Sequence, residues 1–307
     1  MRHLTHLKYI DVVAREGSIR KAADRMSITS TALNRRILAL EDEIGSPIFE
    51  RLPSGVRLNA AGELLIQHIR FQMNDLSRIL SQISDLSGER RGHVSISACA
   101  EMLGNFLPEQ IGRYRDEHQA VSFDVMQHDA EQSLMALGQY DADIAFIYAS
   151  ILPSDIALAA TISQPVIAQM HHTHPLAQSK SLSIEDIMSY PVIVPRGKEG
   201  IRAQIDVGCA RKSVQFAEIV MADNFAFMQH YIHHEMAISL QIPFSLHALP
   251  ASPSEQTLVS CAIKEGEFPN GVAHIAYLKG RTLPVAAARF LDQLVAEVHL
   301  LYPDDAT

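Results

Sequence analysis

The chain has 307 residues, of which 47% are hydrophobic and 20% charged, a balance typical of a globular protein and not of a disordered or fibrous one. On a scale of about 150 residues per domain, this length predicts two domains or one large one. No run of about 18 apolar residues occurs, so we expect no membrane span, and early charges such as Lys8 and Asp11 argue against a signal peptide. We therefore expect a cytoplasmic protein.

The net charge of −9 by itself disfavours binding to nucleic acid, but the charge is unevenly distributed along the chain. Residues 1–60 contain ten Lys and Arg against seven Asp and Glu, a balance of +3, whereas the remainder contains 16 against 28, a balance of −12. Such an asymmetry indicates a basic nucleic-acid-binding module joined to an acidic body.

The basic segment contains three predicted helices. Apolar residues at helical spacing predict the first over 4–15. Ser18 is a good N-cap for the second, whose small pair Ala22–Ala23 lets another helix approach closely. Thr29 can cap the third, which Gly45 ends. Two short helices joined by a three-residue turn form a helix-turn-helix.

The second helix of such a motif places its N-terminal part in the major groove of DNA. Opposite its apolar face lie four polar side chains, namely Ser30, Thr31, Asn34 and Arg35. Asn can bond adenine with two hydrogen bonds, Arg can do the same to guanine, and hydroxyls can reach bases or phosphates. The alternative is that these are merely solvated positions on a surface helix.

Two short extended runs follow in residues 47–59, around the turn residues Pro53, Ser54 and Gly55, and they predict a β-hairpin. Arg51 and Arg57 flank this turn, where guanidinium groups can hold phosphates or enter the minor groove. The hairpin is therefore interpreted as a wing, although both arginines can also be surface charges without a partner.

A long helix is predicted from the N-cap Asn59 to Gly88. Its apolar residues are spaced by threes and fours, close to the seam of a coiled coil. They are Leu65, Ile69, Met73, Leu76, Leu80 and Ile83. A seam this narrow suits one partner helix, as in a dimer, and the alternative is that the stripe packs on the chain's own core.

Beyond a polar boundary at 88–92, runs typical of strands and of helices alternate, beginning with HVSISACA, MLGNFLPEQIGRYRDEH, VSFDVMQ, AEQSLMALGQY and ADIAFIY. The alternation resumes from PVIVP at residue 191 and closes with a helix over 284–302. This pattern predicts an α/β fold with a parallel sheet and crossover helices.

The N-terminal run AADRMSITSTALNRRILALEDEIGSPIFER, followed by GVRLNAAGE, resembles the winged helix-turn-helix of LysR-type transcriptional regulators. The match rests on the spacing of Ala22–Ala23, Leu40–Glu41, Gly45, Pro47, Phe49–Glu50–Arg51 and Ala61–Gly62. The family often has Gln-Pro in place of Ser30–Thr31, Ser in place of Asn34, and basic residues in place of Leu38 and Ala39. Because these positions lie on or beside the reading face, the operator sequence cannot be carried over from relatives.

The resemblance implies an α/β protein with three parts. Residues 1–59 are an all-α winged helix-turn-helix, 60–90 a dimerising linker helix, and 91–307 a two-lobed effector domain of the type 2 periplasmic-binding-protein kind. Lobe one takes 92–160 and 267–302, and lobe two takes 161–266. It also implies double-stranded DNA as partner, a small-molecule effector between the lobes, a homodimer that commonly pairs into a homotetramer, and RNA polymerase if the protein is an activator.

In such folds ligands lie beyond the carboxyl ends of the strands, where helix N-termini present free amides. The candidate effector-binding residues are Ser97, Cys99, Glu101, Met102, Gln127, His128, Arg196, Arg202 and Asn224. The two arginines can bind a carboxylate, which favours a small organic anion, or they can be surface charges on a loop. Glu101 would repel an anion and select an amine or a hydroxyl instead.

Catalytic, metal and cofactor motifs are missing: there is no G-x-S-x-G, no P-loop, no G-x-G-x-x-G, and the cysteines lack C-x-x-C spacing. Histidines cluster at 171, 172 and 174 and at 230, 233 and 234, but neither cluster has an acidic or cysteine ligand assigned beside it. We expect no enzyme, no metal and no cofactor. The alternatives are a solute-binding or enzymatic module whose DNA contact is secondary, and a redox-sensing regulator that uses Cys209 and Cys261.

Overall fold

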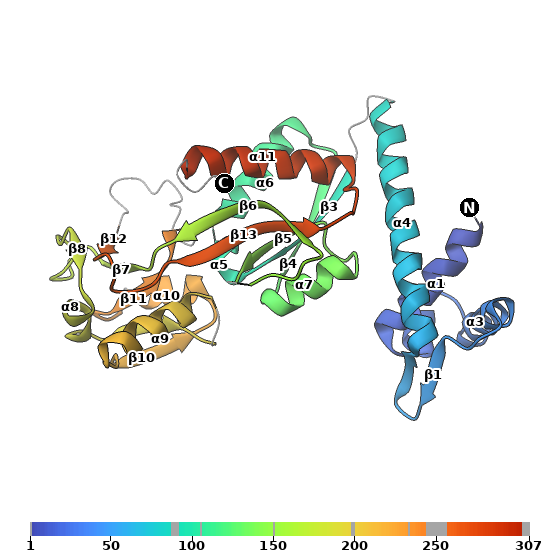
Figure 1. The fold of residues 1–307 in the computed structure, drawn as a ribbon, viewed down its shortest axis with the longest axis horizontal. Coiled ribbons are helices and arrows are strands. Elements are labelled where there is room, and N and C mark those ends of the chain that lie inside the picture. The colour runs from blue at the N-terminus through green and yellow to red at the C-terminus, as the bar shows by residue number, and fades with distance from the viewer. Residues whose placement is uncertain are drawn as a thin grey trace. The chain divides into compact units, whose positions relative to one another are not determined.

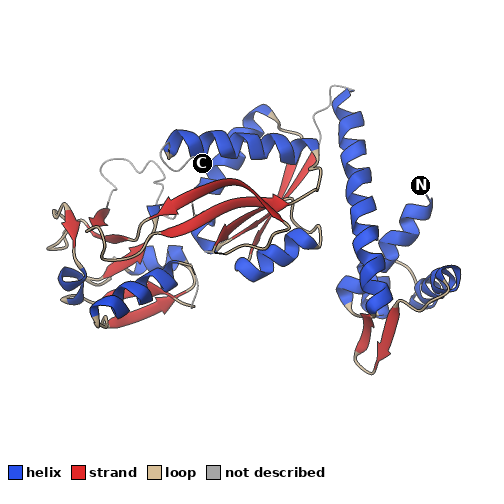
Figure 2. Cartoon of the chain, in the orientation of Figure 1, coloured by secondary structure: helices blue, strands red, loops and turns tan. Residues whose placement is uncertain are grey.

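The structure is a computed structural model that describes residues 2–86, 92–104, 106–149, 151–197, 200–232, 234–243 and 257–302. Figures 1 and 2 show the chain coloured by residue number and by secondary structure. It divides into two compact units, Met1–Ser87 and Gly88–Thr307, and each is described by itself. Most of the predicted boundary at 88–92 lies outside the described residues, as does His233.

The first unit contains four helices and a two-stranded hairpin in its described part. They are α1 (Arg2–Glu16), α2 (Ile19–Arg25), α3 (Ser30–Ile44), β1 (Phe49–Leu52), β2 (Gly55–Leu58) and α4 (Ala60–Leu86). The predicted caps form as expected: the Ser18 side chain accepts from the Lys21 amide, Thr29 accepts from Ala32, and Gly45 ends α3 in the left-handed conformation. Local sequence signals therefore determine the ends of α2 and α3.

The core of this unit lies where the helices meet. Its fully buried side chains are Val13, Ala22, Ala23, Leu33, Ile37, Ile48 and Ile69. A buried ion pair adds a polar connection, because the Asp11 carboxylate accepts from Arg70 of α4 and from Arg15, each at 2.7 Å. Both partners of the Asp11–Arg70 pair are nearly buried, so α1 is held to α4 by charge as well as by apolar packing.

Gly62 marks a close approach between α4 and the segment before the wing. A Cβ atom added there would lie 2.1 Å from the carbonyl oxygen of Ile48, a distance that no side chain tolerates. The Asn59 side chain accepts a hydrogen bond from the Gly62 amide and donates one to the Pro47 carbonyl. Asn59 thereby links the start of α4 to the segment before β1. The glycine is required by packing and not by an unusual backbone angle.

The predicted seam on α4 divides into two parts. Ile69 is fully buried in the unit's own core, and Leu65 and Met73 pack partly against that core. Farther along, Leu80 and Ile83 remain exposed, at 43% and 56%. The first half of the stripe thus serves the chain's own core, which was the alternative interpretation, and only the second half is available to a partner helix.

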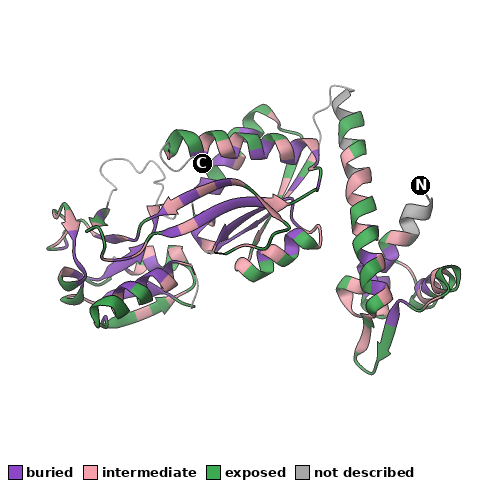
Figure 3. Cartoon of the chain, viewed as in Figure 1, coloured by how far each residue is buried: buried purple, intermediate pink, exposed green. Residues whose placement is uncertain are grey.

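The second unit is built on two sheets. The first has the order β4–β3–β5–β13–β6, from β3 (Gly92–Ala98), β4 (Val121–Gln127), β5 (Ile144–Tyr148), β6 (Ile156–Gln164) and β13 (Gly271–Leu278). Its helices are α5 (Ala100–Leu103), α6 (Phe106–Glu117), α7 (Ala130–Gly138) and α11 (Val285–Leu301). Phe146 of β5 packs with α6 and α11 on one face, whereas Ala145 and Ile147 pack with α7 on the other. Figure 3 shows β5 and β13 buried between these layers.

The second sheet has the order β10–β9–β11–β7–β12–β8. Its strands are β7 (Ile167–His171), β8 (Ser181–Leu182), β9 (Val192–Pro195), β10 (Glu218–Ala222), β11 (Ile238–Gln241) and β12 (Leu258–Ile263). Its helices are α8 (Ile184–Met188), α9 (Ile201–Lys212) and α10 (Phe225–Tyr231). Along β9, Ile193 packs with Met228 of α10, while Val194 packs in the cluster that contains Ile201 of α9.

The sheets are mixed, so the expectation of a simply parallel sheet is wrong in part. Strands β3, β4 and β5 are parallel, as are β9, β10 and β11, but β13 runs antiparallel to both β5 and β6. The chain crosses to the second sheet after Gln164 and returns at Gly271, since these two residues pair at the end of the β6–β13 ladder. Among the described helices, none is long and apolar enough to cross a membrane.

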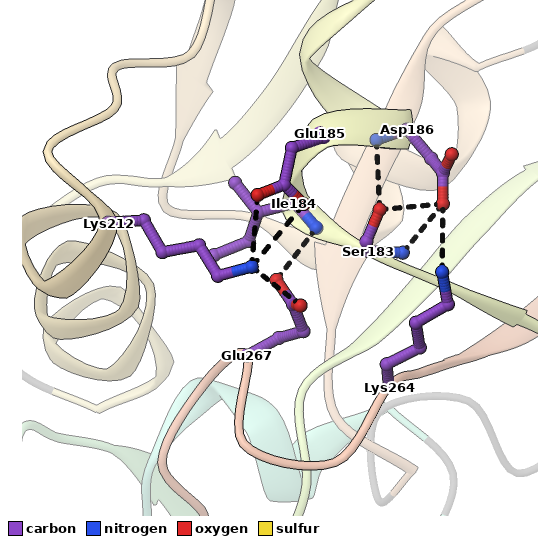
Figure 4. A network of polar contacts seen from close by, with 7 residues as sticks. All are labelled: Ser183, Ile184, Glu185, Asp186, Lys212, Lys264 and Glu267. Atoms are coloured by element: carbon purple, nitrogen blue, oxygen red, sulfur yellow. Dashed lines mark hydrogen bonds and ion pairs between the residues drawn. The ribbon is translucent and has the colours of Figure 1, made fainter.

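A network of charged side chains joins helices α8 and α9 of lobe two to the segment between β12 and β13, which returns to lobe one. Lys212, at the end of α9, pairs with Glu185 of α8 at 3.0 Å and with Glu267 at 2.7 Å, and Glu267 also accepts from the Ile184 amide (Figure 4). Glu267 lies between β12 and β13, on the segment that returns to lobe one. The carboxyl end of α9 is thereby tied to the returning segment.

Lobe one contains a buried ion pair between Asp143 and Arg281. The Arg281 guanidinium contacts the Asp143 carboxylate and donates to the carbonyl of Ala142, and Asp143 also accepts from the Ser95 amide. This pair joins β3, the segment before β5 and the segment after β13. Because both side chains are almost inaccessible, removing the Asp143 carboxylate takes away the negative charge that offsets the buried Arg281 guanidinium.

We predict that Asp143→Ala destabilises the protein by about 3–5 kcal/mol, because it removes the carboxylate of a buried ion pair and keeps the buried Arg281 charge. Thermal and urea unfolding of the variant and the wild type measure the loss. Asp155→Ala, which removes an exposed carboxylate nearby in the sequence, should change stability by no more than about 0.5 kcal/mol. Equal effects of the two substitutions would contradict the role given to the pair.

Candidate DNA-binding and effector-binding sites

The polar face of α3 is presented at the surface of the first unit. Ser30, Thr31 and Arg35 are exposed and Asn34 is half-buried, while Leu33 and Ile37 on the opposite face are buried. The neighbouring Arg36 is engaged elsewhere, since its guanidinium lies 4.6 Å from the centre of the Tyr9 ring. The four predicted residues therefore share one accessible surface at the start of the helix.

The wing lies close to this face. The strands β1 and β2 pair antiparallel, and one Arg51 nitrogen donates to the Asn34 side-chain oxygen at 2.9 Å. Arg57 pairs with Glu50 across the hairpin at 2.7 Å, and both side chains are largely exposed. An exposed pair of this kind is weak, so Arg57 can exchange Glu50 for a phosphate at little cost. Arg51 and Asn34, 17 positions apart in the chain, form one polar patch.

The wing is also fastened to the turn before α2. The Val56 amide donates to the carbonyl of Gly17 at 2.9 Å. A Cβ atom on Gly55, whose φ is +146°, would lie 2.1 Å from that carbonyl oxygen. This close backbone approach explains why the hairpin turn contains glycine at this position.

In the second unit, a cavity of about 440 Å³ lies between the two lobes. Its lining residues are Cys99, Ala100, Glu101, Gln127, His128, Asp129, Ala130, Gln132, Tyr148, Pro195, Arg196, Gly197, Gly200, Asp223 and Phe225. They follow the carboxyl ends of β3, β4 and β5 in lobe one and of β9 and β10 in lobe two. This is where ligands bind in open α/β sheets, because the loops there face a common crevice.

Five predicted effector-binding residues line this cavity: Cys99, Glu101, Gln127, His128 and Arg196. Arg196 is exposed, and its backbone amide donates to the carbonyl of Ala222. It supplies the only Lys or Arg side chain among the described lining residues.

Four predicted residues do not line the cavity. Met102 is fully buried in the core of lobe one, and Ser97 is fully buried between His128 and Ser133, at 3.0 and 2.8 Å. Asn224 caps α10, and Arg202 pairs with Asp206 and Glu218, at 2.8 and 3.0 Å. Each of these side chains already has structural partners, which sequence position alone does not reveal.

Sequence reasoning missed Tyr148, Gln132 and Phe225. Tyr148 ends β5, and its hydroxyl donates to Gln204 of α9 at 2.5 Å. The signal was available, because a tyrosine at the carboxyl end of a third parallel strand must lie at the same edge as the ends of β3 and β4. Gln132 also takes part in the capping box of α7 with Asp129.

Glu101 is the most unusual group of the cavity. Only 9% of its surface is exposed, and no cation lies within ion-pair distance of it among the described residues. Burial raises the pKa of its carboxyl, while hydrogen bonds from its own amide, the Cys99 thiol and the Ile201 amide act in the opposite direction. Ile201 is the first residue of α9, and a Cβ atom added to the N-cap Gly200 would lie 2.7 Å from the Glu101 Oε1 atom. A carboxyl group of lobe one therefore lies beside a helix N-terminus of lobe two, where negative charge is favoured.

The three cysteines and His174 are partly or fully buried. Cys99 and Cys261 are buried, and burial raises the pKa of Cys209 to about 11, with Asp206 and Glu218 adding to the effect. A raised pKa disfavours the reactive thiolate. His174 is buried against the Tyr190 ring. Within the described ranges, no three His, Cys, Asp or Glu side chains gather so as to hold a metal ion.

Comparison with known families decides the identity of both units. Residues 4–63 match the family described as bacterial regulatory helix-turn-helix protein, lysR family, and residues 87–298 match the LysR substrate binding domain. The chain belongs to the LysR family of transcriptional regulators. It thus combines a DNA-binding helix-turn-helix with an effector-binding domain, as the resemblance of its N-terminal segment implied.

Relatives of this LysR-type regulator match it over nearly its whole length. It is 24% identical over 286 residues to the HTH-type transcriptional activator CmpR of Synechocystis sp., which covers 92% of each chain. Its fold is similar to a full-length cysteine variant of OxyR from Pseudomonas aeruginosa, with a TM-score of 0.70, 17% identity and coverage of 97% and 94%. CbnR in complex with its target DNA gives a TM-score of 0.60 at 15% identity, covering 95% of this chain and 98% of that one.

The raised pKa of Glu101 gives the regulator a testable pH dependence. Because the folded protein binds this proton more tightly than the unfolded chain does, the protonated group adds stability below its ordinary pKa of 4.5, and that contribution is lost as the pH rises through the raised folded value. The quantity to follow is the melting temperature of wild type minus that of Glu101→Gln at each pH. We expect this difference to be highest near pH 4.5 and to fall towards pH 8. Glu131→Gln, an exposed control on α7, should show no such trend.

Proposed function

We propose that this regulator binds double-stranded DNA through the N-terminal half of α3 and the wing, and that a small molecule in the cavity between its lobes controls that binding. The observation that carries the DNA-binding part is the joint surface of α3 and the wing, where Arg51 contacts Asn34. The remaining parts, 60–90 and 91–307, would then serve dimerisation and effector binding. Because chromosomal DNA is its target, we propose the cytoplasm as its location.

The division of labour within the DNA-binding surface follows from side-chain chemistry. Asn34 and Arg35 have the donors and acceptors that read base edges, whereas Ser30 and Thr31, beside the α3 N-terminus, suit phosphate oxygens. Arg57 lies on the wing, in a weak exposed pair with Glu50, and suits the phosphate backbone or the minor groove. The solved complex of CbnR with its target DNA supports a DNA-binding role for this fold.

We predict that Arg35→Ala weakens binding to the regulator's own upstream intergenic DNA by about five- to 150-fold, because one base-reading side chain contributes about 1–3 kcal/mol. A mobility-shift titration at fixed moderate salt measures the change. Arg115→Ala removes an exposed arginine of the other unit and should leave the affinity within about twofold. Unchanged affinity in the Arg35 variant would remove α3 from the interface.

Dimerisation is proposed through the second half of the α4 stripe. Ile79, Leu80 and Ile83 are exposed there, a costly arrangement for a helix face that meets only water. A two-fold dimer would also double the DNA contacts on a palindromic site. The family commonly assembles such dimers into tetramers, and we propose the same here.

Leu80→Asp should shift the protein from dimer or tetramer towards smaller species, because a charge in a packed helix seam is buried without a partner. Sedimentation at micromolar concentration measures the distribution of species. The control is Leu300→Asp in α11, where the leucine is 74% exposed and has no proposed contact. Identical sedimentation of the Leu80 variant and wild type would rule out this seam.

The proposed control by effector is a linkage between sites. A ligand that binds one arrangement of the lobes better than another shifts the population of arrangements, and with it the spacing of the DNA-reading heads in the oligomer. If the regulator activates transcription, RNA polymerase is the further partner. The expectation of an organic anion rested on Arg196 and Arg202, and only Arg196 lines the cavity.

A further inference from the structure

The described lining of the cavity between the lobes contains more acidic than basic side chains. These are the carboxyl groups of Glu101, Asp129 and Asp223, against the guanidinium of Arg196. The second arginine expected there, Arg202, is held by Asp206 and Glu218. An anionic ligand would therefore meet more repulsion than attraction in most of the cavity.

The anion-binding position of the cavity is already occupied by the chain itself. The N-terminus of α9, a 12-residue helix, is the lobe-two element that would attract a carboxylate, because its free amides and dipole favour negative charge. The Glu101 carboxylate of lobe one lies directly against this helix end, at the N-cap Gly200. Gly200 has no side chain with which to cap the helix, so Glu101 supplies the negative charge that faces it.

Gly200 also makes room for this contact. It adopts a φ of +60°, and a Cβ atom added there would lie 2.7 Å from the Glu101 Oε1 atom. The carboxylate thus lies directly against the backbone of the α9 N-cap. An anionic ligand at this helix end would have to displace the Glu101 carboxylate or lie beside its negative charge, and either is unfavourable.

The same carboxylate has capacity for a cation. A carboxylate has about four lone-pair sites with which it can accept hydrogen bonds. It is nine-tenths buried and faces no positive side chain among the residues that the structure describes. A buried carboxylate of this kind interacts strongly with a cation that enters its cavity, because little water screens the pair.

The aromatic lining favours the same class of ligand. Tyr148 and Phe225 both line the cavity, and ring faces attract ammonium groups. Tyr148 is oriented by its hydrogen bond to Gln204, and burial together with the nearby Glu101 and Cys99 holds the pKa of its phenol far above the ordinary range, so the ring carries no charge.

We infer that the effector of this regulator carries a protonated amine, which the cavity recognises through the buried Glu101 carboxylate. This inference rests on the proposed function, because it takes the cavity as the effector site. Glu101 is then the residue that sets specificity: it fills the anion position at α9 and offers its remaining acceptor to the ligand.

The test uses the full-length protein and two probes that share one tail, n-butylammonium and valerate, whose heads have opposite charge. Both are small enough for a cavity of about 440 Å³. Ligand-observed NMR titrations at a pH of about 7.5 and constant ionic strength give the two dissociation constants. We expect wild type to bind butylammonium more tightly than valerate. Tighter binding of valerate, or no measurable preference, would overturn the inference without any variant.

Glu101→Gln keeps the size and one acceptor oxygen for the Ile201 amide but removes the charge. We expect it to weaken butylammonium binding by about tenfold or more and to leave valerate binding unchanged or stronger. Glu131→Gln, beside the lining residue Gln132 but outside the lining, should change neither constant by more than about twofold. Equal butylammonium binding by Glu101→Gln and wild type would also overturn the inference.

A mobility shift on the same preparations separates this inference from the proposed function. Protein that binds its upstream DNA but prefers valerate refutes only the amine-bearing effector. Protein that binds neither its upstream DNA nor either probe refutes both.

Discussion

The antiparallel pairing of β6 with β13 is the constraint on which the effector unit depends. The ladder runs from the pair Ile156–Leu278 to the pair Gln164–Gly271, and the whole of lobe two is inserted in the chain between Gln164 and Gly271 (Figure 1). Because the chain leaves and re-enters lobe one side by side, the two lobes can share a crevice while each keeps its own sheet. A cavity at that crevice is therefore a property of the topology and not of any single loop.

Helix α9 connects this crossing to the cavity. The Gln204 side chain donates to the carbonyls of Gln164 and Pro269, at the two ends of the crossing, and accepts from the Tyr148 hydroxyl. At one end of the helix the N-cap Gly200 lies against the Glu101 carboxyl group, and at the other Lys212 forms an ion pair with Glu267. Any movement of the lobes must therefore break or exchange polar contacts of α9, which gives a ligand beside Glu101 a direct effect on their arrangement.

The DNA-binding unit was largely predictable, because its signals are local. The caps Ser18 and Thr29 and the C-cap Gly45 lie within a few residues of the helix ends that they determine. The α4 stripe was less predictable: periodicity shows that Ile69 and Leu80 lie on an apolar stripe, but not that one meets the chain's own core and the other remains exposed. That distinction depends on where α1 packs, which periodicity does not report.

The amino-acid sequence alone specifies the order of the modules, the polar face of α3 with Asn34 and Arg35, and the strand ends beside which the cavity lies. Which side chains reach the cavity is settled by tertiary packing, because partners distant in the chain compete for them. Arg202 forms an ion pair with Glu218, and Ser97 shares a hydrogen bond with Ser133. Glu101, in contrast, meets the start of α9, 100 positions later in the chain, and a charge that the sequence left without a clear role becomes the buried acceptor of the site.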